Sequence, residues 1–190
     1  MASSSLSRRR RLWYLAILAC SAVVLYLLVL RDLRFFLIPS RSMEPTLATR
    51  EYILSTNEHE YRRGDVIVVK DPMIAGGYLV KRLVALPGDH VQMDGGALFL
   101  NGAYISEPYL PEPIQYALPE YVVPDGQVFI LGDNRNLSVD SHDWSDDAEV
   151  PQTAGVAVES IVGKVRFVYL PIGHARRVGS YPPAPSVGPP

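Results

Sequence analysis

Residues 12–30 contain no charged side chain, and this stretch constrains the fold of the chain more than any other feature. A helix rises about 1.5 Å per residue, so a stretch of this length would cross most of a hydrocarbon core about 30 Å thick. We therefore expect a transmembrane helix over residues 12–30. Arg8–Arg11 precede it, whereas only Arg31 and Arg34 follow closely, with Asp32 between them. The positive-inside rule then predicts a cytoplasmic N-terminus, residues 1–11, with the rest of the chain on the exported, periplasmic or extracellular, face.

Two other interpretations of this stretch stay open. A cleaved signal peptide would have an apolar region of only about 7 to 15 residues before a small-residue cleavage site. A lipoprotein signal is suggested by Ile17-Leu18-Ala19-Cys20, although apolar residues continue to Leu28. Cys20 is the single cysteine, so no disulfide can form within one chain and the cysteine count does not identify the compartment.

The remaining length suits one soluble domain, and its pattern is that of short strands. The chain has 190 residues and a formal net charge of -2, without the clustered basic surface of a nucleic-acid-binding protein, so nucleic acid is not expected as a partner. Turns rich in glycine and proline separate the apolar runs, which predicts a mostly β, antiparallel domain over residues 31–176. The runs are Tyr52–Leu54, Asp65–Val69, Tyr78–Leu86, Val91–Met93, Ala97–Leu100, Val128–Leu131 and Ile161–Tyr169.

Two segments lack this pattern. Residues 107–124 are rich in proline and tyrosine without a clear period, so we expect them to leave the sheet. Residues 177–190 are rich in proline and are expected to form a disordered tail.

Lys81 is the most informative single residue. In an alternating strand it shares a face with Leu79, Leu83 and Ala85. Burial among aliphatic side chains disfavours the ammonium form and lowers the pKa of a lysine. The alternative is that the lysine stem lies along apolar surface and the amine reaches water. A serine hydroxyl needs a nearby base to become a nucleophile, so Lys81 and a loop serine make a testable pair.

A third polar segment follows the Val128–Leu131 run. It contains Gly132-Asp133-Asn134-Arg135 and then residues 138–143. Taken alone, such a segment is a turn whose side chains cap backbone groups. His142 beside Asp140 and Asp143 also permits a Ser-His-Asp mechanism, which stays open as an alternative. The four histidines show no metal-ligand spacing, so no metal is expected.

In this order, the segments resemble the type I signal peptidase family, which contains membrane-bound serine proteases. The sequence Ser40-Arg41-Ser42-Met43-Glu44-Pro45-Thr46-Leu47 resembles the nucleophile box of the family. Val80-Lys81-Arg82 resembles the lysine box, and Gly132-Asp133-Asn134-Arg135 with Ser138 and Asp140-Ser141 the last box. With the apolar stretch, the resemblance extends from about residue 8 to 170. It implies an antiparallel catalytic domain of the signal peptidase type after one N-terminal transmembrane helix.

The resemblance also implies roles for individual residues. Ser42 would attack the scissile carbonyl, and Lys81, neutral at rest, would accept its proton. The dyad and its oxyanion hole would be supported by Ser40, Ser138, Asp140 and Arg82. Shallow apolar pockets for small side chains would be lined by Ile38, Met43, Leu47 and Val80. These roles imply endoproteolytic cleavage of exported preproteins after Ala-X-Ala-like signal-peptide sites, without a cofactor.

His142 departs from the resemblance, because it stands where many members have an arginine. The expected partners are preprotein signal peptides and the lipid bilayer, and a monomer is expected. Two other functions stay open. One is a catalytically inactive, membrane-anchored peptide-binding protein of the same fold, and the other is a specialised maturation protease with a single substrate.

Overall fold

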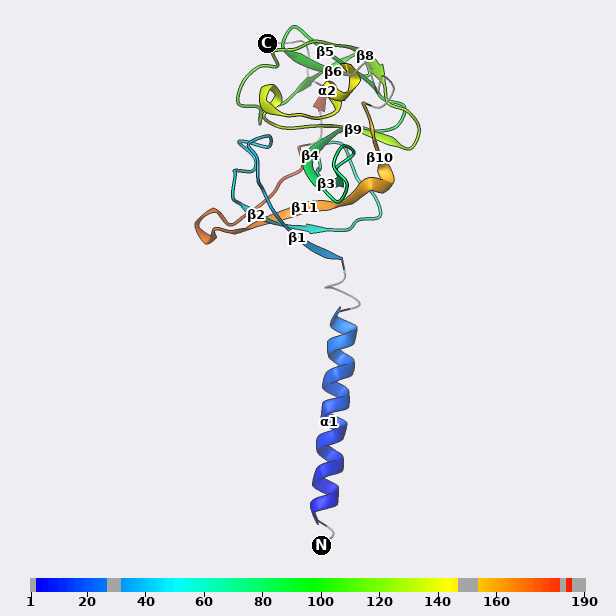
Figure 1. The fold of residues 1–190 in the computed structure, drawn as a ribbon, viewed down its shortest axis with the longest axis vertical. Coiled ribbons are helices and arrows are strands. Elements are labelled where there is room, and N and C mark those ends of the chain that lie inside the picture. Colours follow the sequence, from blue (N-terminus) through cyan, green and yellow to red (C-terminus); the bar gives the residue numbers. More distant parts are fainter. Residues whose placement is uncertain (1–2, 27–31, 147–153, 182–183, 186–190) are drawn as a thin grey trace. The chain divides into compact units, whose positions relative to one another are not determined.

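The computed structural model describes residues 3–26, 32–146, 154–181 and 184–185 (Figure 1). The chain divides into two compact units, Met1–Leu33 and Arg34–Pro190, and each is described by itself. The first contains helix α1, Ser3–Leu25. The second contains almost all of the β structure and every residue that the sequence nominates for catalysis.

Helix α1 differs from the transmembrane helix expected over residues 12–30. It begins at Ser3, so its first half includes the charged block Arg8–Arg11, and it shares residues 12–25 with the predicted span. Among the described residues, no helix combines the length and the apolar character needed to cross a membrane. The predicted transmembrane helix is therefore not supported, and residues 27–30 of the predicted span lie outside the described part of the chain.

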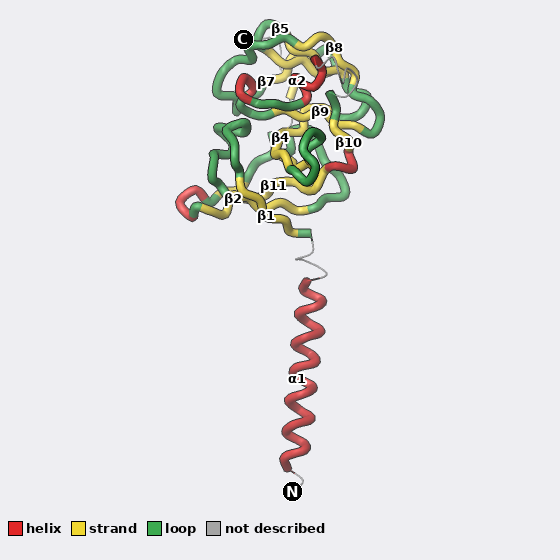
Figure 2. The backbone as a smooth tube through the Cα atoms, viewed as in Figure 1, coloured by secondary structure: helices red, strands yellow, loops and turns green. Residues whose placement is uncertain are grey.

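Two sheets form the second unit, and the strand pairs within them are antiparallel, which confirms the predicted mostly β class (Figure 2). The first sheet has the order β1-β2-β11-β3-β4-β9-β10, and β12 pairs with β11. Its strands are β1 (Leu33–Leu37), β2 (Tyr52–Thr56), β3 (Val66–Lys70), β4 (Tyr78–Ala85), β9 (Gln127–Leu131), β10 (Val156–Ala157), β11 (Ile161–Leu170) and β12 (Arg176–Arg177).

The second sheet has the order β13-β7-β6-β5-β8. Its strands are β5 (His90–Asp94), β6 (Ala97–Leu100), β7 (Ala103–Ser106), β8 (Leu118–Val122) and β13 (Ala184–Pro185). The short helices of the unit are η2 (Arg135–Leu137), α2 (Ser141–Asp146), η3 (Val158–Ser160) and η4 (Ile172–His174).

Each of the seven strand-like runs of the sequence coincides with a strand, except that Asp65 and Leu86 lie just outside β3 and β4. The two segments without a pattern contain strands as well. In the 107–124 segment, β8 pairs with β5. In the expected disordered tail, Arg177 lies in β12 and residues 184–185 form β13, which pairs with β7, so these described residues are ordered. Residues 182–183 and 186–190 of that tail lie outside the described residues. These strands form because they pair with strands distant in the sequence, and local periodicity does not predict such pairing.

Strand β4 lies between β3 and β9, and this position buries both of its faces. Residues that alternate along a strand point to opposite faces, so Lys81 and Arg82 enter different layers of the protein. Both are buried, with 2% and 1% of their surface exposed. A central strand therefore carries two adjacent basic side chains into the interior, where a polar group is stable only with hydrogen-bond or ion-pair partners.

Candidate active site

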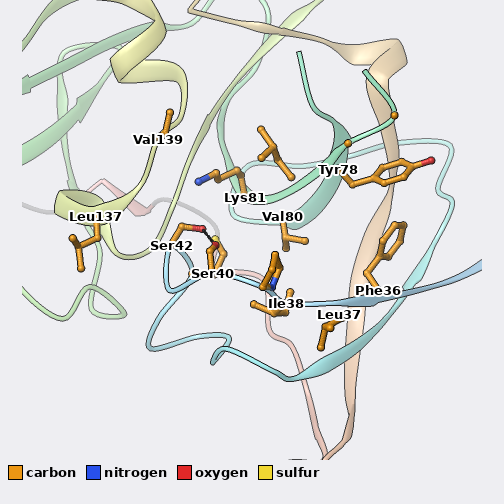
Figure 3. Close-up of a pocket in the computed structure, with 15 residues that line it drawn as sticks. Phe36, Leu37, Ile38, Ser40, Ser42, Tyr78, Val80, Lys81, Leu137 and Val139 are labelled. Carbon is orange, nitrogen blue, oxygen red and sulfur yellow. Dashed lines mark hydrogen bonds between the residues drawn. The ribbon is translucent and has the colours of Figure 1, made fainter. Parts of the chain in front are cut away.

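An open groove of about 550 Å³ runs along the surface of the second unit (Figure 3). One wall comes from the end of β1 and the turn after it, and the other from the β3–β4 turn, β4 and the segment after η2. Most of its lining is apolar, and its polar side chains are Ser40, Ser42, Lys81 and the phenol of Tyr78.

Ser42 lies in the turn after β1, and the polar segment of residues 132–140 fixes that turn. The backbone N–H of Asn134 donates to the carbonyl oxygen of Ser42 at 3.0 Å, and its side-chain amide donates to the carbonyl oxygen of Arg41 at 3.3 Å. The hydroxyl oxygens of Ser40 and Ser42 lie 3.2 Å apart. Asn134, in the 132–140 segment, therefore holds the turn that contains Ser42. The sequence did not identify this role of Asn134.

Lys81 is buried, and its amine faces the same groove. Its Nζ donates a hydrogen bond of 2.6 Å to Oγ of Ser138. Burial lowers the pKa of Lys81, and the negative charge of Asp140 opposes that shift only in part. The Ser138 hydroxyl donates in turn to Asp140, whose Oδ2 also accepts the N–H of Gly132 at 2.7 Å. Of the two placements that the sequence left open, the structure shows the buried one, with Lys81 only 2% exposed.

Gly132 allows the three segments to meet. A Cβ atom at this position would lie 2.2 Å from Oγ of Ser138 and 2.4 Å from the carbonyl oxygen of Ser42. Neither distance is possible for a real side chain, so only glycine fits between them. Ser42, Lys81 and Ser138 are thereby brought to one place from three separate parts of the sequence.

Arg82, the neighbour of Lys81, forms a buried ion pair on the other face of β4. Its guanidinium donates to both carboxylate oxygens of Asp133 at 2.7 and 2.6 Å and to the carbonyl oxygen of Gly64 at 2.7 Å. The ring of Tyr109 lies 4.1 Å from the guanidinium carbon. Because Asp133 follows Gly132 directly, this pair ties β4 to the segment that holds Ser42.

His142 lies beside the hydrogen-bonded chain, between two carboxylates. Its Nδ1 lies 2.8 Å from Oδ1 of Asp140, its Nε2 lies 3.3 Å from Oδ1 of Asp143, and its ring stacks on Tyr116 with centroids 3.7 Å apart. Among the described residues, Asp140, His142 and Asp143 are the one group whose atoms cluster as metal ligands do, and they pair with one another. Since both ring nitrogens face carboxylates, the geometry does not favour the Ser-His-Asp alternative.

Three of the four predicted pocket residues line the groove, namely Ile38, Met43 and Val80. Leu47 does not, because it packs in the core below, against β2, β3 and β11. The groove also contains apolar residues that the sequence analysis did not nominate, among them Leu137 and Val139. Both lie next to Ser138, and strand-like alternation around that serine was the signal that could have identified them.

The chain is similar to known proteins over most of its length. Residues 10–170 match the family described as signal peptidase, peptidase S26. The chain is 38% identical to a probable signal peptidase I-1 of Synechocystis over 84% of this chain and 83% of that protein. It is 35% identical to signal peptidase I of Bacillus licheniformis over 87% of this chain and 91% of that one. A solved signal peptidase I from Enterococcus faecalis matches with a TM-score of 0.47 and 28% identity, over 57% of this chain and 98% of that chain. By the family match over residues 10–170 and these two relatives, the chain belongs to the signal peptidase family, peptidase S26, and is a peptidase.

Proposed function

We propose that this peptidase removes N-terminal signal peptides from exported preproteins, with Ser42 as nucleophile and Lys81 as general base. The observation that carries the proposal is the buried amine of Lys81, which shares an open groove with the Ser42 hydroxyl. A lysine can act as a base near neutral pH only if its environment disfavours the ammonium form. Burial supplies that environment here.

The proposed reaction has two steps, acylation of Ser42 and hydrolysis of the acyl-enzyme. The Ser42 oxygen forms a bond to the scissile carbonyl carbon while its proton passes to Lys81. The carbon–nitrogen bond then breaks, and Lys81 returns the proton to the leaving amine. In the second step Lys81 takes a proton from water, the hydroxide attacks the acyl carbon, and the Ser42 oxygen leaves with the proton. Hydrogen bonds at an active site tighten when substrate binds, so the Ser40–Ser42 contact can give way to a Ser42–Lys81 contact.

The negative oxygen that forms in each step needs donors. We assign these donors as the Ser42 backbone N–H and the Ser40 hydroxyl. The hydroxyl oxygens of Ser40 and Ser42 lie 3.2 Å apart. Removing one donor of this kind typically costs a hundredfold or more in rate. Ile38, Met43 and Val80 leave shallow apolar space beside them, which suits small side chains before the scissile bond.

We further propose that the enzyme is attached to a membrane through the apolar part of α1. Large apolar side chains there are exposed, including Leu12, Trp13 and Leu18, and exposed apolar surface of this extent is typical of a lipid or protein contact. The preceding Arg8–Arg11 favour a cytoplasmic N-terminus. Flotation of the full chain with phospholipid vesicles tests the attachment, and a chain that stays in the dense fraction would exclude it.

The decisive experiment is cleavage of a preprotein with an Ala-X-Ala site by the detergent-solubilised full chain. Wild type should cut at that site, and Ser42→Ala and Lys81→Ala should each be inactive. His142→Ala, which alters a residue outside the proposed dyad, should retain the same cleavage site. If Lys81→Ala retained activity and His142→Ala lost it, the dyad would be wrong.

Two results would support the other functions. Binding of the preprotein without cleavage would indicate a peptide-binding protein. Cleavage of one preprotein in a panel of many would indicate a specialised maturation protease.

A further inference from the structure

Two exposed aliphatic side chains flank the reaction centre. Leu137 is 63% exposed and Val139 is 68% exposed, although both are apolar and both line the groove that contains Ser42 and Lys81. Exposed apolar side chains are common singly on protein surfaces. A pair of them beside the candidate nucleophile and base is a more specific arrangement, because substrate must pass through the same groove.

Their direction follows from Ser138, which lies between them. Its backbone is extended, with φ -107° and ψ 126°, and its side chain points inward to Lys81. In an extended segment the neighbours of an inward-pointing residue point outward. Val139 follows this extended residue and Leu137 ends η2 before it, and both side chains are exposed and line the groove.

The two side chains lie on one side of Ser42, and the predicted pockets lie on the other. In Figure 3, Leu137 and Val139 lie on one side of Ser42 and Lys81. The group formed by Ile38, Val80, Leu37 and Phe36 lies on the other side. Ser138 is also close to Ser42 itself, since its side chain and the Ser42 carbonyl would both collide with a single Cβ at Gly132. Peptide residues on either side of a scissile bond are about 3.3 to 3.6 Å apart along an extended chain. The first one or two residues beyond the bond would thus reach Leu137 and Val139.

Buried and tethered residues hold this side of the groove in place. The guanidinium of Arg135 is buried and donates to both carboxylate oxygens of Glu107 at 2.7 and 2.6 Å. Asn136 accepts the N–H of Gln115 at 2.9 Å and donates to the carbonyl oxygen of Pro113 at 3.1 Å. Through these contacts the 107–124 segment fixes η2, which ends at Leu137. Because this wall is already held in place, less conformational entropy is lost when a ligand binds.

We propose that Leu137 and Val139 form a subsite for the residues immediately after the scissile bond and that this subsite favours aliphatic over acidic side chains. The inference rests on the proposed function and adds a specificity determinant to it. The ligand is the N-terminal end of the mature protein, which leaves as the amine. Neither Leu137 nor Val139 has a charge or a donor to pair with an acidic side chain, so such a side chain would lose water contacts there without gaining a hydrogen bond.

The test uses peptides with one Ala-X-Ala site and leucine, glycine or aspartate directly after it. For wild type, we expect kcat/KM to be about tenfold higher for leucine than for aspartate, the scale typical of one apolar contact. In Leu137→Ser, Val139→Ser and the double variant, this ratio should fall to about twofold or less. Ile172→Ser changes an apolar residue that is 81% exposed in η4, outside the groove lining, and should keep the wild-type ratio.

A second measurement separates the subsite from bond cleavage. Once Ser42 is acylated, leucinamide competes with water: its nitrogen attacks the acyl carbon, its proton passes to Lys81, and the Ser42 oxygen leaves with that proton. The share of product formed with leucinamide, relative to glycinamide, should drop in the variants. Thermal unfolding shows whether each variant is folded.

The outcomes are distinct. An unchanged leucine-to-aspartate ratio in folded variants would overturn the subsite and leave the proposed function intact. The same ratio together with weaker binding to phosphatidylcholine–phosphatidylglycerol vesicles would mean that the surface meets lipid, which also overturns it. Failure of wild type to cut even the glycine peptide would remove the proposed function and the subsite with it.

Discussion

The Nζ of Lys81 donates its hydrogen bond to Ser138, and the hydroxyl of Ser138 donates onward to the buried carboxylate of Asp140. This direction matters because a hydroxyl whose proton is committed to a carboxylate can only accept from the amine. A neutral lysine held in this way uses one N–H on Ser138 and keeps its lone pair for another proton. The arrangement therefore orients a base as well as burying it.

The lowered pKa of Lys81 predicts how activity depends on pH. Because the neutral amine is the base, kcat/KM should rise as pH increases through the folded-state pKa of Lys81, which burial holds below the ordinary value of 10.5. A pH–rate profile of the Ala-X-Ala peptide measures this. A profile that rises only at or above pH 10.5 would contradict the proposed base.

The same shift predicts a stability effect with a definite sign. Between the folded-state pKa of Lys81 and 10.5, the unfolded chain holds a proton that the folded chain has lost, so the free energy of unfolding should increase with pH in that window. Urea unfolding across that range measures the slope. Lys81→Met should reduce the slope, whereas Ser42→Ala, which is inactive but keeps the lysine, should retain it. Equal slopes in the two variants would rule out Lys81 as the titrating group.

Gly132→Ala should abolish activity even though it adds one methyl group. The new Cβ would collide with Ser138 and with the backbone of Ser42, and the backbone cannot yield without moving the nucleophile. We expect a fall in kcat/KM of at least about a hundredfold and a loss of about 1–3 kcal/mol in the free energy of unfolding. Gly173→Ala is the matched control, since no neighbouring atom of the described residues lies within 4 Å of the place its Cβ would occupy. Similar kinetics for the two variants would exclude the proposed contact.

Breaking the Arg82–Asp133 pair should destabilise the fold more than removing an exposed ion pair. Arg82→Met leaves the Asp133 carboxylate buried without its partner, which typically costs about 3–5 kcal/mol. Arg41→Met removes a pair with Glu44 in which the arginine is exposed, and should cost about 1 kcal/mol or less. Denaturant unfolding measures the free energy of unfolding of both variants. Equal losses in Arg82→Met and Arg41→Met would mean that burial does not determine how much an ion pair contributes to stability. The double variant Arg82→Met with Asp133→Leu should recover part of the loss.

The sequence predicted the parts of the site whose signal is local. Alternation of apolar residues around Lys81 made its burial one of two possibilities, and the family resemblance paired it with Ser42 and Ser138. Lys81 donates a hydrogen bond to Ser138. The sequence alone could not predict contacts between segments that are distant along the chain. The Glu107–Arg135 pair joins a proline-rich segment to the last box, and Leu47 resembles a pocket residue in sequence but packs beneath the groove. The placement of Gly132 against Ser42 also depends on how three strands assemble.

The last described residues of the chain cover the interior rather than extending away from it. The N–H of Tyr181 donates to the carbonyl oxygen of Gly64 at 3.2 Å, its ring packs near that of Tyr109, and Ala184–Pro185 pair with β7. The Arg82 guanidinium lies beneath, 5.4 Å from the Tyr181 ring. Because a domain folds during synthesis only from the residues already made, Tyr181 can take this place only late in that process. A nascent chain halted before Tyr181 would carry Ser42 and Lys81 but would lack the tyrosine ring over Arg82.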